Sequence, residues 1–333
     1  MPDHRYYDEG FKREVRWDVP LTEGYDYTAL EDTSLTEEIA SCDVLWVHGW
    51  QSATLREAIQ IASRTGKKVL MRGENSDMAM PDGGMMRAWL KRRYLNRIFE
   101  CCDGFLSIGH LNRMYYLNRG IEKSRIFPMP YAVDNLAFAK AAAAAREQEP
   151  SLKERLGIPR DVPVILFAGK LSRRKRPDIL FWAMHSLGDI SPAPALVFAG
   201  DGEMMGELKS AAPNAHFVGF VNQTELPAYY AMADVFVLPS EKEPWGLAIN
   251  EAMACGTAVV VSDEVGCAAD LVDEHTGVVF ETGDVSALAD ALRLAIANAG
   301  PMGKAAKEKI SGWDFEADVA GLNQALKALG AKP

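Results

Sequence analysis

Residues 234–262 read DVFVLPSEKEPWGLAINEAMACGTAVVVS, which is a strand, a loop, a helix and a second strand in succession. The apolar runs at 235–238 and 258–261 are short and rich in valine, as strands buried on both faces are. Between them, residues 247–255 have the length and apolar spacing of a helix. Because a strand, a helix and a strand in this order pack as a parallel pair, the stretch predicts a doubly wound α/β sheet.

The same alternation extends over most of residues 161–298. Four further strand candidates are VPVILFAGK (162–170), PALVFAGDGE (194–203), HFVGFV (216–221) and GVVFETG (277–283). Helical periodicity predicts helices from Pro177, at 202–211, at 224–232 and at 285–298. Six strands with helices between them predict a Rossmann-like domain over 161–312.

A second and shorter alternation occupies residues 1–140. Strands are predicted at 14–18, 43–50, 67–75, 104–107 and 125–131, and helices at 53–65, 85–100 and 112–119. Residues 141–160, with their alanine run and short helical stretch, indicate a linker and lead-in helix. The sequence thus predicts two facing Rossmann-like domains with a cleft between them. An amphipathic helix within 313–333 is expected to pack back on the first domain.

Composition limits the class of protein. The 333 residues are 48% hydrophobic and 25% charged, which is ordinary for a globular protein and excludes a disordered or collagen-like chain. The five cysteines include no pair at metal-site spacing, so they indicate free thiols in a reducing compartment. No apolar leader and no run of bilayer-spanning length is present, and we expect a cytoplasmic location.

Charge is distributed unevenly along the chain. Residues 1–160 hold 23 basic and 23 acidic residues, whereas residues 161–333 hold 13 basic and 23 acidic ones, which is the whole net charge of −10. An acidic domain is unsuited to nucleic acid, and we predict no nucleic-acid partner. Five of its basic residues nevertheless fall within 170–176. This cluster indicates a local anion site, with a solvated loop as the alternative.

Ligands of doubly wound sheets bind beyond the carboxyl ends of the strands, so the loops after the strands carry the candidate site. The first loop holds Gly169, Lys170 and Lys175; glycine admits a close backbone approach, and lysines can neutralise phosphates. The second loop, GDGEMMG (200–206), is a near match to a dinucleotide fingerprint. It lacks the acidic ribose ligand about 20 residues further on, which disfavours a nicotinamide site and leaves a close-approach loop for some nucleotide.

The third loop, SEKEPWGLAINE (240–251), combines two carboxylates with a helix start. Glu243 lies in the loop, Glu251 lies one helical turn after Leu247, and the unpaired amides at 246–248 form an anion site. Carboxylates on either side of a bound diphosphate could accept hydrogen bonds from a sugar and from a ribose. The alternative is a turn carboxylate and a surface helix residue.

These motifs resemble those of family-4 glycosyltransferases of GT-B fold, the glycosyl transferases group 1. Glu243 and Glu251 have the spacing of that family's signature, GKLSRRK (169–175) resembles its phosphate-binding loop, and GDG (200–202) resembles its nucleotide loop. The stretches VGFV (218–221), ELPAYYAMADVFVLPS (225–240) and EAMACGTAVVVSDEVG (251–266) are also typical of it. The resemblance runs in order through nearly all of residues 161–290.

The resemblance implies a role for each matching position. Lys170 and Lys175 would hold the diphosphate, Glu243 the donor sugar and Glu251 the ribose, with the base beside Phe220 and Val221. The residues implied in catalysis are Lys175, Glu243, Lys170 and His48. Those implied in substrate binding are Gly169, Gly200, Asp201, Gly202, Phe220, Val221, Trp245, Gly246, Leu247, Ala248, Glu251, Arg72 and Glu74.

The resemblance also implies a retaining transferase that moves a sugar from a UDP- or GDP-sugar to an unidentified acceptor. The acceptor would be a saccharide or a lipid-linked saccharide, in polysaccharide or glycolipid synthesis. No cofactor and no metal are expected, because the chain has no Asp-x-Asp and the lysines and helix-start amides would stabilise the leaving diphosphate. No side chain is assigned as general base, since a diphosphate oxygen can take the acceptor's proton.

Residues 1–140 resemble a subset of the same family less distinctively, through FKREVRWDVPLTEGYDY (11–27), VLWVHGWQS (44–52) and KKVLMRGENSD (67–77). This domain is short by one β-α-β unit. A nucleotide-sugar-binding protein with little or no transferase activity therefore remains as an alternative. His48 ends a predicted strand and Arg72 and Glu74 follow the next one; each is either a substrate contact or a structural residue.

Residues 85–97, MMRAWLKRRYLNR, carry five basic residues and no acidic one, with apolar residues at a spacing of four. Two structures fit this pattern. One is a helix in peripheral contact with the anionic inner face of a membrane, and the other is a solvated helix that packs its apolar stripe on the core.

Overall fold

The computed structural model describes residues 5–19, 23–30, 32–81 and 83–331. The chain divides into two compact units: a larger unit of residues 1–21 and 132–312, and a smaller unit of residues 22–131 and 313–333. The larger unit therefore includes the first 21 residues, which the sequence analysis groups with the first domain. Contacts between residues that are far apart in the sequence decide this grouping, and a local sequence pattern does not reveal such contacts.

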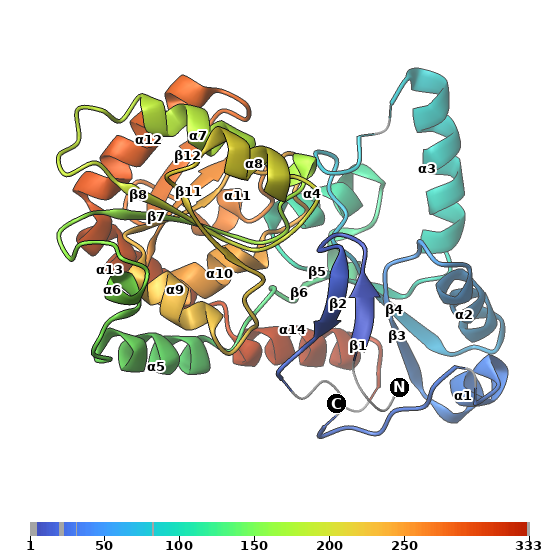
Figure 1. Cartoon of the computed structure of the whole chain (residues 1–333). Coiled ribbons are helices and arrows are strands. Elements are labelled where there is room, and N and C mark those ends of the chain that lie inside the picture. Colours follow the sequence, from blue (N-terminus) through green and yellow to red (C-terminus); the bar gives the residue numbers. More distant parts are fainter. Residues whose placement is uncertain (1–4, 20–22, 31, 82, 332–333) are drawn as a thin grey trace. The chain divides into compact units, whose positions relative to one another are not determined.

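The larger unit contains a six-stranded parallel sheet in the order β12-β11-β10-β7-β8-β9 (Figure 1). All six predicted strands are present, and the first of them, β7, lies inside the sheet with strand order reversing beside it. The strands are β7 (Val164–Ala168), β8 (Ala195–Ala199), β9 (His216–Gly219), β10 (Val235–Leu238), β11 (Ala258–Ser262) and β12 (Gly277–Phe280). The helices are α5 (Asn135–Arg146), α6 (Leu152–Arg155), η2 (Arg173–Lys175), α7 (Asp178–His185), α8 (Met205–Ala211), α9 (Leu226–Met232), α10 (Leu247–Ala254), α11 (Ala268–Leu271), α12 (Val285–Ala297) and α13 (Ala299–Ile310).

Helices cover both faces of this sheet, which is why its strands are apolar throughout. Successive side chains of a strand point to opposite faces. Ile165 and Phe167 of β7 belong to a buried cluster shared with α7, α8 and α12. On the other face Phe236 of β10 contacts Tyr230 of α9, whose ring lies near Phe138 of α5. The doubly wound sheet predicted for 161–312 is confirmed.

The smaller unit contains a four-stranded parallel sheet in the order β3-β4-β5-β6. Its strands are β3 (Val44–His48), β4 (Lys68–Arg72), β5 (Gly104–Ser107) and β6 (Ile126–Pro128). Its helices are α1 (Leu35–Ser41), α2 (Ala53–Arg64), α3 (Met85–Phe99), α4 (His110–Asn118), η1 (Lys123–Arg125) and α14 (Phe315–Ala328). The second α/β alternation predicted from the sequence is therefore also confirmed.

Both faces of the smaller sheet are covered as well. Met71 and Phe105 share one buried cluster with α1, α2, α3 and α4. Leu70 and Leu106, on the opposite face, pack with Ala325 of α14. The last helix of the chain therefore completes the core of the smaller unit, and this unit is closed by residues from both ends of its sequence.

The first strands form a separate hairpin within the larger unit. β1 (Arg5–Asp8) pairs antiparallel with β2 (Arg13–Arg16), with Tyr6 opposite Val15. The sequence predicts a strand at 14–18 but not its partner, because RYYD places two tyrosines between charged residues and contains no apolar run. This hairpin bears on the candidate site.

Among the residues that the structure describes, no helix has both the length and the apolar character needed to cross a membrane. The five cysteines are free, as their spacing indicates. Burial raises the pKa of Cys102 and of Cys255 to about 12, so these thiols stay protonated and serve as core residues.

Candidate functional site

Three loops meet the carboxyl edge of the larger unit's sheet where β7 and β10 are neighbours. From β7 the sheet continues to β8 on one side and to β10 on the other, so strand order reverses at this point. η2 follows β7, α8 follows β8 and α10 follows β10. The loops that carry the predicted residues therefore lie at the edge where doubly wound sheets bind ligands.

The glycines of the first two loops let their backbones approach closely. The Gly169 N–H donates to the carbonyl of Ala199 over 2.9 Å. Gly200 has φ of +156°, and a Cβ on it would lie 1.8 Å from the Gly169 carbonyl oxygen. A Cβ on Gly202 would lie 2.6 Å from the Leu171 carbonyl oxygen. Loop packing is thus sufficient to explain Gly200 and Gly202 of the dinucleotide-like motif, whereas a Cβ on Gly206 would meet no atom within 4 Å.

Asp201, between these glycines, is used within the same loops. Its Oδ1 accepts a hydrogen bond from the Gly202 N–H over 2.8 Å, and its carbonyl accepts one from the Leu171 N–H over 2.9 Å. The residue therefore holds the second loop against the first.

Glu243 lies in a cluster of cations. The residue is 8% exposed, and its carboxylate accepts hydrogen bonds from Lys175 Nζ at 2.6 Å and from Arg174 Nη1 at 2.8 Å. Its backbone is bonded to Glu264 and Gly266, each over 2.9 Å. The structure brings Glu243 and Lys175 together, as two predicted site residues. Arg174 is a third member that the sequence analysis counts only within the basic stretch 170–176.

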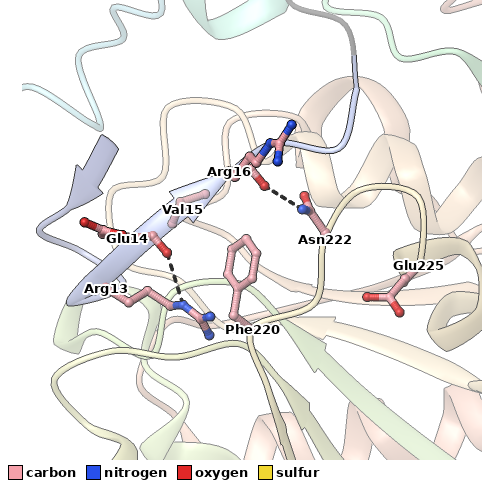
Figure 2. A pocket seen from close by; sticks show the side chains of 7 residues that line it. All are labelled: Arg13, Glu14, Val15, Arg16, Phe220, Asn222 and Glu225. Atoms are coloured by element: carbon pink, nitrogen blue, oxygen red, sulfur yellow. Dashed lines mark hydrogen bonds between the residues drawn. The ribbon is translucent and has the colours of Figure 1, made fainter. Parts of the chain in front are cut away.

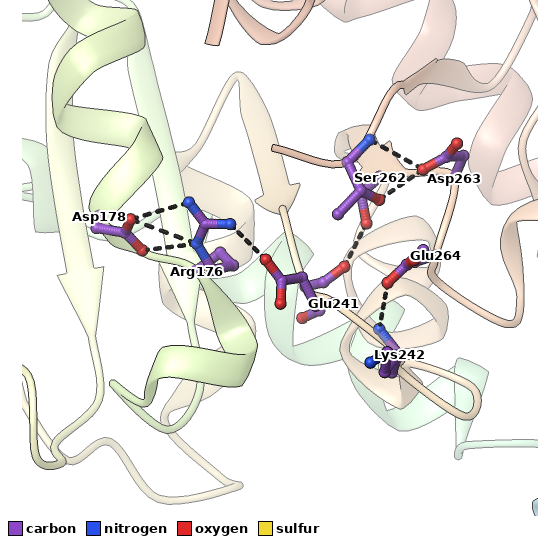
Figure 3. Close-up of polar contacts among 9 residues, drawn as sticks. Arg176, Asp178, Glu241, Lys242, Ser262, Asp263 and Glu264 are labelled. Carbon is purple, nitrogen blue, oxygen red and sulfur yellow. Dashed lines mark hydrogen bonds and ion pairs between the residues drawn. The ribbon is translucent and has the colours of Figure 1, made fainter. Parts of the chain in front are cut away.

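Neighbouring residues of the same loops form a second polar cluster (Figure 3). Arg176 lies between two carboxylates, donating to Asp178 over 3.2 Å and also to Glu241. The Asp178 and Glu241 carboxylates raise the pKa of the Arg176 guanidinium, Asp178 most. The Lys242 N–H donates to the Glu264 carboxylate over 2.9 Å. These pairs fix the loop after β10.

Glu251 is positioned by α10 and by a tyrosine of α9. The Tyr230 hydroxyl donates to Glu251 Oε2 over 2.7 Å. Burial raises the pKa of Glu251 to about 7, and the hydroxyl offsets only part of that effect. Sequence reasoning did not select Tyr230, because it lies 21 positions away from Glu251 and only packing of α9 on α10 joins them.

The turn that leads into α10 is buried, whereas the first residue of the helix is exposed. Gly246 has φ of +99°, and a Cβ on it would lie 2.9 Å from a Leu238 side-chain atom. Trp245 is 3% exposed and donates its indole N–H to Asn250 over 3.0 Å. Leu247 is 40% exposed. The structure therefore places Trp245 in the core, where its ring supports the turn, and leaves the helix start open beside Leu247.

A cavity of about 140 Å³ lies against these loops in the larger unit. The predicted residues that line it are Gly169, Gly200, Phe220, Val221, Ala248 and Glu251. Phe11 and Trp17, from the hairpin and the residue after it, also line it. The sequence does not point to these two, since only the folded structure brings residues 5–19 to this unit.

Phe220 also lines a second cavity, of about 420 Å³, with Asn222, Glu225 and residues 13–16 of β2. Figure 2 shows the Phe220 side chain pointing toward β2. The Arg13 guanidinium lies 5.1 Å from the centre of the Phe220 ring. The predicted base-binding phenylalanine is therefore in direct contact with the hairpin.

Lys170 is directed toward the hairpin as well. Its Nζ lies 2.8 Å from Asp8 Oδ1 and 2.9 Å from Oδ2. Lys175, in contrast, faces Glu243. The two lysines predicted to bind the diphosphate thus have different ion-pair partners. Lys170 pairs with Asp8 of β1, and Lys175 pairs with Glu243 of the third loop.

In the smaller unit Arg72 has a structural role. The residue is 6% exposed and donates to Asp318 of α14 over 2.8 Å and to two backbone carbonyls, at 129 and 130, over 3.3 Å each. The guanidinium therefore joins β4 to β6 and α14. A substrate contact is not needed to explain its position.

In the smaller unit His48 is the last residue of β3 and Glu74 follows β4; both side chains reach solvent, and the His48 ring is covered in part. Partial burial, followed by the positive charge of Arg72, lowers the pKa of His48, which favours the neutral imidazole. Glu74 accepts a hydrogen bond from the Tyr131 hydroxyl. Across the described ranges, no three His, Cys, Asp or Glu side chains are grouped so as to hold a metal ion.

Residues 148–311 match the family model for "Glycosyl transferases group 1". A D-inositol 3-phosphate glycosyltransferase of Xylanimonas cellulosilytica is 32% identical over 64% of this chain and 54% of its own length. A GDP-mannose-dependent alpha-(1-6)-phosphatidylinositol monomannoside mannosyltransferase of Mycolicibacterium smegmatis is 28% identical over 71% of this chain and 65% of its own length. This chain therefore spans about half to two thirds of these relatives.

The fold is likewise that of a solved glycosyltransferase. The crystal structure of a glycosyltransferase from Rickettsia africae superimposes with a TM-score of 0.73 at 16% identity, covering 90% of this chain and 80% of that one. At this identity the likeness shows the fold, with its parallel sheets and alternating helices. Residues 148–311 of this chain thus match the glycosyl transferases group 1, and its fold is that of the GT-B glycosyltransferases.

Proposed function

We propose that this chain binds a nucleotide-diphosphate sugar, a UDP- or GDP-sugar, in its larger unit and transfers the sugar with retention of configuration. The observation that carries the proposal is the arrangement of two carboxylates around the start of α10. Glu243 lies on the lysine side, bonded to Lys175, and Glu251 lines the cavity beside Phe220. In this scheme Glu251 binds the ribose, Glu243 binds donor-sugar hydroxyls, and the base lies beside Phe220 and Val221.

The reaction breaks the bond between the sugar C1 and a diphosphate oxygen and forms a bond between C1 and an acceptor hydroxyl oxygen. The acceptor's proton passes to a diphosphate oxygen, so no side chain acts as general base. Negative charge develops on the leaving diphosphate. Lys170, Lys175 and the free amides at the start of α10 would stabilise that charge. The scheme requires no metal ion.

The relatives support the donor class. One of them is GDP-mannose-dependent by name, and both are named as glycosyltransferases or mannosyltransferases. The names of both include an inositol compound, either D-inositol 3-phosphate or phosphatidylinositol monomannoside. For this chain we propose a saccharide or lipid-linked saccharide as acceptor.

The proposal is tested by calorimetric titration of the full chain with UDP, GDP and NAD, followed by a donor-hydrolysis screen across UDP- and GDP-sugars. We expect binding of UDP or GDP, no binding of NAD, and slow hydrolysis of one donor class that persists in EDTA. NMR of the early product should show the anomeric configuration of the donor. Tighter binding of NAD than of both nucleotides would contradict the proposal, and dependence on a divalent metal would contradict its metal-independent chemistry.

A second candidate function is nucleotide-sugar binding with little or no transfer. The size of the smaller unit favours it, because its sheet has four strands where the larger unit's sheet has six. The same titration separates the two functions. Micromolar binding of UDP or GDP without turnover of any donor would favour the binding protein.

We also propose a peripheral membrane contact through α3. Met85, Met86, Trp89 and Leu90 are 92%, 77%, 59% and 53% exposed, on a helix whose other residues include five basic ones. Exposed apolar and basic side chains on one helix complement the interface of an anionic bilayer. The packing alternative explains only the inner residues of α3, since Leu95, Ile98 and Phe99 are those that it buries.

Vesicle sedimentation tests this contact. We expect the chain to partition to vesicles of phosphatidylglycerol and phosphatidylcholine, and not to vesicles of phosphatidylcholine alone. The double variant Trp89→Ser with Leu90→Ser should lower the partition coefficient by about tenfold, because both side chains lose their apolar burial. Leu294→Ser, which alters a similarly exposed leucine of α12, is the matched control. Equal loss in both variants would remove α3 from the contact.

A further inference from the structure

The turn of the N-terminal hairpin is a compact polar structure directed at Lys170. The Asp8 carboxylate accepts hydrogen bonds from the Gly10 and Phe11 amides over 2.8 and 3.0 Å. The same carboxylate lies 2.8 Å from Lys170 Nζ, and its side chain is 12% exposed. A Cβ on Gly10 would lie 2.6 Å from Lys170 Cδ, so the lysine stem passes directly against the turn.

Aromatic contacts place the same turn over the predicted base position. The Phe11 ring meets the Phe220 ring edge to face with centres 5.0 Å apart, and Lys170 Nζ lies 4.9 Å from the Phe11 ring centre. The Trp17 ring lies 6.3 Å from that of Phe220. Phe11 and Trp17 line the same 140 Å³ cavity as Val221 and Glu251.

Side-chain hydrogen bonds fix the hairpin and Asp18 to this part of the unit. The Asn222 side-chain amide donates to the Arg16 carbonyl over 2.7 Å (Figure 2). Asp18 accepts a hydrogen bond from the Thr224 N–H over 3.3 Å and another from its hydroxyl. Both contacts lie in the loop after Phe220. The hairpin is thus joined to the loop that carries the predicted base-binding residues.

The charge on Lys170 is therefore already neutralised by an acid. A carboxylate and a phosphate oxygen bind an ammonium group in the same way, through charge-assisted hydrogen bonds, and they cannot occupy one donor position together. A diphosphate that takes Lys170 must displace Asp8 or bind against its negative charge. Phe11, in contrast, presents an apolar ring to the cavity and carries no such conflict.

We infer that the hairpin turn is part of the donor site: Phe11 forms a wall of the nucleoside cavity, and Asp8 holds Lys170 until a diphosphate displaces it. The inference rests on the proposed function and adds residues to the donor site that lie outside the three loops. The turn is thus expected to favour binding of the nucleoside and to oppose binding of the diphosphate.

Calorimetric titration of the full chain with uridine, UDP, guanosine and GDP tests this. Asp8→Asn keeps an oxygen that can accept from the Gly10 and Phe11 amides but removes the charge. We expect it to tighten binding of the nucleoside diphosphate by roughly fivefold, as expected for a partly exposed ion pair, and to leave nucleoside binding unchanged. Glu9→Gln, which alters an exposed carboxylate next to Asp8 in the same hairpin, is the matched control and should change neither.

Phe11→Ala tests the other half of the inference, because it should weaken binding where Asp8→Asn tightens it. It should weaken nucleoside and nucleoside diphosphate binding alike, by about three- to tenfold, because the cavity loses an aromatic wall. Thermal melting of each variant checks that the fold is retained. Unchanged or weaker diphosphate binding in Asp8→Asn would overturn the inference while leaving the proposed function intact. Failure of every nucleotide to bind the wild-type chain would overturn both.

Discussion

At the scale of single residues, two opposing effects act on the pKa of Glu251. Its carboxylate is held at the cavity by the Tyr230 hydroxyl, yet burial raises its pKa to about 7 from an ordinary 4.5. Near neutral pH the group is thus divided between its two protonation states. A carboxylate buried in this way lowers stability relative to a neutral residue in its place. The position of Glu251 at the cavity therefore favours a binding role.

This raised pKa predicts a dependence of stability on pH. Below pH 4.5 Glu251 is neutral in both states, and between pH 4.5 and about 7 it ionises first in the unfolded chain. Its contribution to the free energy of unfolding is therefore lost as pH rises through this window, by up to about 3 kcal/mol. Glu251→Gln, which stays neutral, should be more stable than wild type at pH 8 and about equal near pH 4.5.

Urea denaturation at both pH values measures this difference, and Glu14→Gln serves as the exposed control. Higher stability of the wild type at pH 8 would contradict the burial argument.

In the donor assay Glu251→Ala should lose about 1–3 kcal/mol of binding free energy, the value of hydrogen bonds to a charged group. An unchanged donor affinity would remove Glu251 from the site.

Lys175 gives a prediction about catalysis. If it stabilises charge on the leaving diphosphate, Lys175→Ala should lower kcat by about a hundredfold and change the donor Kd much less. Arg173→Ala removes an equal charge from the same loop, at a side chain that is 76% exposed, and should leave both constants near wild type. Equal loss of kcat and donor affinity in Lys175→Ala would reduce the lysine to a ground-state contact.

At the scale of elements, α14 depends on one close approach. A Cβ on Gly321 would lie 1.7 Å from the Pro128 carbonyl oxygen, in a backbone that cannot move aside cheaply. Gly321→Ala should therefore displace α14 from β6 and destabilise the smaller unit by about 2 kcal/mol or more. Gly300→Ala, in α13, meets no atom within 4 Å and should be neutral or stabilising by about 0.5–1 kcal/mol. Thermal melting of the two variants compares them, and equal melting temperatures would contradict the packing argument.

Element prediction succeeded where side chains repeat and failed where they do not. The strands of both sheets were recognised from apolar runs of four or five residues flanked by turns. β1 and α13 were among the elements missed, the first because RYYD has no apolar run and the second because Gly300, Pro301 and Gly303 occupy its first turns. Proline and glycine weaken a helical pattern, although proline is well tolerated in the first turn.

At the scale of the whole molecule, we expect nucleotide binding to stabilise the larger unit only. A nucleotide at a hundred times its Kd adds about 2.7 kcal/mol to the stability of the state that binds it. In hydrogen exchange we expect added UDP or GDP to slow exchange in residues 169–176, 200–206 and 240–251. Exchange in residues 53–72 of the smaller unit should be unchanged. Protection spread equally over both units would argue against a donor site confined to these loops.

The sequence by itself determined both sheets, the three loops and the residue types in them, because strand and helix periods and glycine positions are local properties of a chain. Through a family resemblance it also assigned Glu243 and Lys175 to one donor site, and the structure then showed them in contact. Only the tertiary structure decided that Arg72 is held by Asp318, that Trp245 supports the core, and that Tyr230 fixes Glu251. It also joined Asp8 and Phe11 to Lys170 and Phe220. Apart from the Trp245–Asn250 contact, these contacts link residues from 21 to 246 positions apart, and the local periodicity of a sequence does not show which distant side chains will pack together.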